Sequence, residues 1–123
     1  MAEIKGKEFG SPDEVREFKD GKGKVELVDL NGHMIGRGTF EPGWRWSEHV
    51  KPLSGTDSCQ VEHIGYVLEG EMTVRMDDGS ELHVRPGDAF HMPPGHDAWV
   101  ENERCVLLDF GGLKGYATSA SRG

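Results

Sequence analysis

The sequence is poor in cysteine and has no long apolar run. Only two cysteines, Cys59 and Cys105, occur among its 123 residues, so a disulfide framework is not expected. No stretch approaches the ~18 continuous apolar residues of a membrane helix. The first residues, Met-Ala-Glu-Ile-Lys, contain no apolar segment of the kind that a secretion signal needs. We therefore expect a cytoplasmic protein with reduced cysteines and no membrane contact.

Basic residues are also in the minority. The chain has 14 lysines and arginines against 22 acidic residues, a formal net charge of −8. Such a chain repels a phosphate backbone, which argues against nucleic acid as a partner. The length suits a single domain that buries enough surface to fold without a disulfide or a structural metal.

Glycine, by contrast, is abundant, and its placement predicts β structure. The 18 glycines fall singly between short apolar stretches and mark many turns. About nine short strands at turn spacings of about 8–12 residues predict an antiparallel barrel or sandwich. One such strand is expected over Trp44 to Val50. A capping pattern predicts one short helix over Ser11 to Phe18. We expect an N-terminal arm over 1–24, a β-barrel over 25–112 and a disordered tail over 113–123.

Two groups of residues carry the spacing of a known family. In the first, His49 follows Gly43 after five residues, and Gly70 follows His63 after six. The second contains Gly87, Pro93, Gly95 and Asn102. In these motifs the chain resembles the cupins, over about Val25 to Phe110. The resemblance implies an all-β, jelly-roll-like antiparallel barrel.

The sequence departs from the cupin pattern at the positions where the family usually holds a metal. Of the four customary ligands only His49 is unchanged. Lys51, His63 and Ala98 stand at the other three positions. The neighbouring sequence supplies other ligand types from which a replacement site can form. We expect His49, His63 and His96 to converge, with Cys59 as a fourth ligand. Nitrogen and thiolate ligands suit zinc, iron, nickel or copper better than magnesium or calcium.

Strand alternation suggests what else faces the cavity. If the segment that contains His49 is a strand, Arg45 shares its inward face and could bind an anionic group of a ligand. Gly65 shares the face of His63, where a missing side chain would leave room for a small molecule. Trp44 and Trp46 are expected to pack in the core. Catalytic residues are not assigned, although His91, His96 and Glu62 are candidates for an acid or a base.

The sequence is compatible with two functions. The chain is either a metal-dependent enzyme of the oxygenase or isomerase type that acts on a small, anionic molecule, or a non-catalytic module that binds a ligand or a metal. We also expect a homodimer, because strands over Val25 to Phe40 outside the motifs would leave a sheet edge that needs covering.

Overall fold

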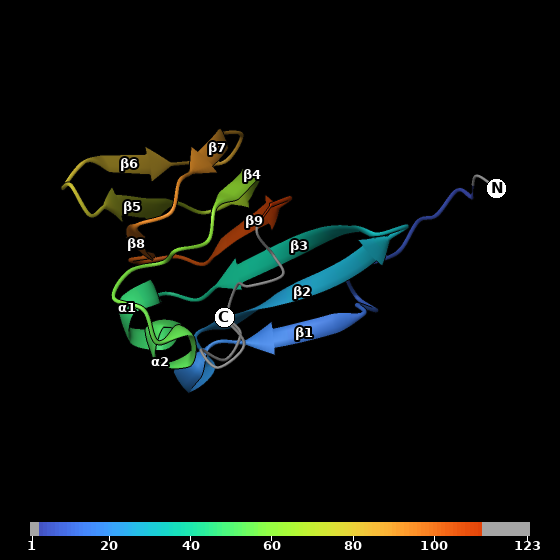
Figure 1. Ribbon diagram of the computed structural model, residues 1–123, viewed down its shortest axis with the longest axis horizontal. Coiled ribbons are helices and arrows are strands. Elements are labelled where there is room, and N and C mark those ends of the chain that lie inside the picture. Colours follow the sequence, from blue (N-terminus) through green and yellow to red (C-terminus); the bar gives the residue numbers. More distant parts are fainter. Residues whose placement is uncertain (1–2, 112–123) are drawn as a thin grey trace.

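The computed structural model describes residues 3–111 and consists of two antiparallel sheets that face each other (Figure 1). Within this range nine strands form, and all but β1 lie where the turn pattern predicts a strand. The six-stranded sheet has the order β1 (Glu14–Glu17), β2 (Gly23–Leu30), β3 (His33–Phe40), β9 (Cys105–Asp109), β4 (His63–Glu69), β7 (Ala89–Met92). The three-stranded sheet has the order β6 (Glu81–Val84), β5 (Met72–Met76), β8 (His96–Trp99). The predicted all-β jelly-roll-like fold is therefore confirmed.

The hairpin between β2 and β3 shows how local sequence sets the register. Asn31 and Gly32 have φ values of 57° and 89°, the left-handed region that a tight two-residue hairpin turn requires. The turn places Leu30 opposite His33. From there the two strands pair along their whole length, which fixes which side chains point inward.

The predicted N-terminal helix over Ser11 to Phe18 is wrong. Glu14–Glu17 forms β1, which pairs antiparallel with residues 24–27 of β2. The backbone N–H of Asp29 donates to Asp13 Oδ2 at 2.7 Å and ties the start of this strand to the sheet. Pairing with an exposed strand edge thus outweighs the local capping pattern. It also covers the β2 edge on which the prediction of a dimer rested.

The predicted strand over Trp44 to Val50 is also wrong. This segment turns into two short helices, α1 (Trp46–His49) and α2 (Lys51–Ser54). Asp97 Oδ1 accepts the backbone N–H of Ser47 at 3.1 Å and so satisfies a donor in the first turn of α1,. The helical turn removes the strand alternation from which the orientations of Arg45 and His49 were inferred.

The hydrophobic core lies between the two sheets. Trp44 and Trp46 are each only 2% exposed, which confirms their predicted place in the core. The Trp44 ring packs against Phe40, with ring centroids 4.6 Å apart, and against Phe18 at 5.5 Å. Cys105 is fully buried in the same core, and both cysteines are free thiols.

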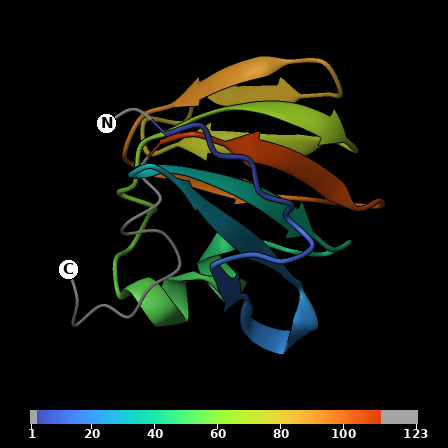
Figure 2. The same cartoon turned by 90° about the vertical axis from the view of Figure 1, so that its right-hand side faces the viewer.

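The N-terminal arm runs along the outer face of the larger sheet (Figure 2). Arg37 of β3 lies over the Phe9 ring, 5.3 Å from its centroid, and Asn31 donates to the carbonyl oxygen of Glu3 at 2.7 Å. The arm therefore covers part of β2 and β3. No helix in the described range is long and apolar enough to cross a membrane. The tail predicted over 113–123 lies outside the described residues.

Candidate metal centre

Three buried side chains, Cys59, His63 and His96, place one ligand atom each within 4.8 Å of one another. Their residues are 2%, 6% and 3% exposed. His63 is the first residue of β4 and His96 the first of β8. Cys59 lies in the loop before β4. The structure thus brings together three of the four residues that the sequence predicts as metal ligands.

Backbone pairing fixes Cys59 beside His96. The two residues form an isolated antiparallel bridge, in which the N–H of Cys59 donates to the carbonyl oxygen of His96 at 2.7 Å. The Cys59 carbonyl oxygen in turn accepts the N–H of Gly95 at 2.7 Å and that of His96 at 3.3 Å. The long loop that follows α2 is therefore the element that delivers the thiol to the site.

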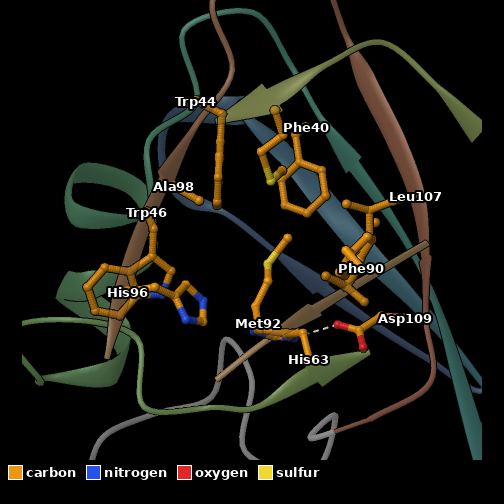
Figure 3. Close-up of a pocket in the computed structure, with 13 residues that line it drawn as sticks. Phe40, Trp44, Trp46, His63, Phe90, Met92, His96, Ala98, Leu107 and Asp109 are labelled. Carbon is orange, nitrogen blue, oxygen red and sulfur yellow. Dashed lines mark hydrogen bonds and ion pairs between the residues drawn. The ribbon is translucent and has the colours of Figure 1, made fainter. Parts of the chain in front are cut away.

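Each imidazole of the group is oriented by an acceptor on its far side. His63 Nδ1 lies 2.6 Å from Asp109 Oδ2, and Nε2 of the same ring lies 3.7 Å from Cys59 Sγ. Figure 3 shows the contact between His63 and Asp109. His96 Nδ1 donates to the carbonyl oxygen of Pro93 at 2.8 Å, so its Nε2 is the nitrogen left for the group. Acceptors of this kind fix the tautomer and the ring orientation of metal-binding histidines.

The contacts within the group shift two pKa values in opposite directions. Burial by itself would raise the pKa of the Cys59 thiol, but hydrogen bonds from His63 and His96 outweigh it and lower the pKa to about 6. Burial would lower the pKa of His63, but the hydrogen bonds with Asp109 and Cys59 raise it to about 9. For Cys105, burial and the nearby charge of Glu69 raise the pKa of the thiol to about 12. The site therefore favours a thiolate, while the core cysteine stays a thiol.

The structure does not place His49 in this group. Its ring Nδ1 accepts the backbone N–H of Arg45 at 3.0 Å, so the imidazole is engaged at the start of α1. His49 is buried, but it sits on a helix rather than on the strand that the prediction assumed. The prediction that His49 converges with His63 and His96 is therefore wrong: the group consists of Cys59, His63 and His96.

Arg45 and Gly65 also have places other than those predicted. The Arg45 guanidinium lies 4.4 Å from the Trp99 ring centroid and pairs with Asp97 Oδ2 at 3.4 Å. It does not line the pocket beside the histidines. A Cβ at Gly65 would lie 2.0 Å from the carbonyl oxygen of Leu108. The absent side chain therefore allows the close approach of β4 and β9, and does not make room for a ligand.

Sequence reasoning missed Asp109. The residue is 6% exposed and ends β9, where it holds His63. A signal was present: Asp109 lies two residues after Leu107 and so points to the same, inward face of an apolar strand. The candidate acid–base residues His91 and Glu62 instead pair with each other on the surface, with 2.7 Å between Nε2 and Oε2.

A small cavity of about 30 Å³ lies beside the two histidines. Most of its wall is apolar and comes from both sheets and the segment between β3 and α1. Figure 3 shows Trp44 and Phe40 at one end, His63 and Asp109 at the other, and Met92 between them. The cavity thus connects the candidate metal ligands with the aromatic core.

Comparisons with known proteins agree with this architecture. The cupin domain model matches residues 36–111, more than half of the chain, and the protein therefore belongs to the cupin family. No curated protein shows a significant match.

Solved structures show the same fold at low sequence identity. A protein of unknown function from Acinetobacter shares 14% identity over 80% of this chain and 90% of that chain, with a TM-score of 0.61. KdgF from Halomonas shares 23% identity over 76% and 82%, with a TM-score of 0.53. An RmlC-like cupin from Shewanella frigidimarina shares 24% identity over 80% and 83%, with a TM-score of 0.52. At such identities these likenesses show the fold alone.

Proposed function

We propose that this cupin binds one transition-metal ion through Cys59 Sγ, His63 Nε2 and His96 Nε2, and a small molecule in the adjoining cavity. The observation that carries the proposal is the convergence of these three ligand atoms within 4.8 Å. Both imidazoles are already oriented by acceptors on their Nδ1 atoms. Little rearrangement is then needed when an ion binds.

The donor set fits a borderline metal. A thiolate and two imidazoles suit zinc, iron, nickel or copper, whereas magnesium and calcium prefer oxygen ligands. Three protein ligands leave a coordination position open, which is the pattern of catalytic rather than structural zinc sites. A bound ion would supply Lewis acidity to a molecule in the cavity. The thiol can act as a ligand only while it is reduced, which agrees with the cytoplasmic location that we propose.

Binding without catalysis is the function that the geometry supports best. Within the described residues, the titratable groups that line the cavity are His63, His96 and Asp109. The first two would hold the ion and the third orients an imidazole, so none of them is left as a separate acid or base. The open coordination position favours, as a second candidate, an enzyme of the oxygenase or isomerase type.

Metal analysis of protein purified without a histidine tag tests the proposal. We expect the wild type to carry near-stoichiometric metal, and Cys59→Ser and His63→Ala to lose most of it. Cys105→Ser is the matched control, because it alters the other buried cysteine away from the site, and it should retain metal. Equal metal contents in Cys59→Ser and wild type would contradict the proposal.

A further inference from the structure

One residue that lines the cavity, Trp44, has a polar group that the described part of the fold leaves without a partner. Trp44 Nε1 is the single buried side-chain nitrogen or oxygen in the described residues that makes no hydrogen bond. A buried donor without an acceptor costs ~1–3 kcal/mol, and most such groups in native proteins are satisfied. Trp44 is also one of the residues that line the cavity, so an acceptor that occupies the cavity is a candidate partner for its N–H.

The indole is held firmly in place. Phe40 and Phe18 pack against its ring. Its backbone N–H donates to the Glu41 carbonyl oxygen at 2.9 Å, and its carbonyl oxygen accepts the N–H of Val100 at 2.9 Å. A donor fixed in this way needs no reorganisation when an acceptor arrives, which favours binding.

The charges around the cavity favour an uncharged occupant. Among the described residues that line it there is no lysine or arginine, and Arg45 is engaged with Asp97 and Trp99 outside it. The Asp109 carboxylate already contributes a negative charge to the wall. His63, the cationic partner of Asp109, lies at the other end of the cavity from Trp44 (Figure 3) and is already engaged by that carboxylate. An anion that contacts Trp44 would therefore be desolvated without a lysine or arginine beside it, at a high cost in free energy.

The size of the cavity limits the occupant further. A volume of about 30 Å³ exceeds the ~10–15 Å³ that one water molecule needs on this measure. It is far below the ~300–1,000 Å³ of pockets for larger ligands. The space fits a molecule of very few non-hydrogen atoms. Met72 and Met92 in the wall are flexible enough to adjust to its shape,.

We infer that the cavity binds a small uncharged molecule whose acceptor atom receives the hydrogen bond of Trp44 Nε1. The inference extends the proposed function, because this molecule would lie beside the metal ligands. Its test does not depend on metal: protein treated with EDTA has the same indole and the same apolar wall. A failure of the metal site and a failure of this inference are thus separate results.

Nuclear magnetic resonance of the indole N–H groups tests the inference on the full chain labelled with ¹⁵N. Formamide and formate are suitable probes, because they have nearly the same size but differ in charge. Trp44→Phe identifies the Trp44 signal, and Trp99→Phe identifies an indole that stacks on Arg45 outside the cavity. Titrations are made with purified protein and with protein treated with EDTA.

Formamide should shift the Trp44 N–H signal downfield and saturably in the metal-free protein, with little effect on Trp99, while formate should have no comparable effect. Trp44→Phe should bind formamide about five-fold more weakly, judged from the methyl signals of Met92, because one neutral hydrogen bond is lost. An unmoved Trp44 signal, an equal response to formate, or an equal shift of Trp99 would overturn the inference. The shift is measured on wild-type protein. If Trp44→Phe fails to fold, Trp46→Phe and Trp99→Phe identify the other two of the three indole signals and so leave the third to Trp44.

Discussion

Removing the Asp109 carboxylate should destabilise the protein far more than removing a surface carboxylate with the same contact distance. Asp109 Oδ2 lies 2.6 Å from His63 Nδ1, and both side chains are less than a tenth exposed. Glu71 Oε1 lies 2.6 Å from His83 Nε2, but these side chains are 45% and 41% exposed. The two pairs therefore differ in burial and not in distance, which makes Glu71→Ala the matched control for Asp109→Ala.

The expected magnitude follows from this difference in burial. Breaking a buried pair by removing one partner costs ~3–5 kcal/mol, because the other group stays buried without compensation. The imidazole of His63 can lose its proton and so avoid part of the cost, which puts the expected loss for Asp109→Ala at about 3 kcal/mol. Exposed pairs contribute ~0–1 kcal/mol, and Glu71→Ala should fall in that range.

Urea denaturation at neutral pH in the presence of EDTA measures both losses without a contribution from bound metal. Single domains of this size have a total stability of ~5–15 kcal/mol, so both variants should still fold. The dependence of the unfolding free energy on urea concentration should stay unchanged. Losses of equal size in the two variants would refute the reasoning that burial makes the contact between Asp109 and His63 important.

Three further expectations concern backbone packing, the surface and assembly. Gly65→Ala should lower stability by ~1–3 kcal/mol or prevent folding, because the added Cβ meets the backbone of Leu108,. Gly10→Ala is the control, because a Cβ at Gly10 has no atom within 4 Å. Equal melting temperatures of the two variants would contradict this expectation. Arg45→Ala should leave the metal content of tag-free protein unchanged, and a clear loss of metal would show that Arg45 contributes to the metal site. Light scattering should report a homodimer, for which the exposed Ile64 and Phe110 supply apolar surface, and a monomer at micromolar concentration would disprove it.

The fold was predictable because its signals are local. Turn residues such as Asn31-Gly32 act within a few positions, and alternation along each strand follows from its pleat. The two errors, at Ser11 to Phe18 and at Trp44 to Val50, have a different origin. Both segments take their structure from distant partners, namely residues 24–27 of β2 and the Asp97 carboxylate, and no local pattern contains that information.

The site was predictable only as far as its residues lie near the family motifs. His63 stands at a motif position, and Cys59 and His96 lie within four residues of one, so sequence alone could nominate them. His49 was misplaced because its orientation depended on a strand that does not form. Asp109 was missed because it lies 46 positions from His63, a contact that only the pairing of β4 with β9 creates.

X-ray absorption spectroscopy of the tag-free protein loaded with zinc is the most direct test of the proposed metal centre. Three protein ligands predict one sulfur at ~2.3 Å and nitrogens from two imidazoles at ~2.0–2.1 Å. The sulfur contribution should disappear in Cys59→Ser and persist in Cys105→Ser. A zinc environment of nitrogen and oxygen alone in the wild type, or a spectrum unchanged by Cys59→Ser, would contradict a centre built from Cys59, His63 and His96.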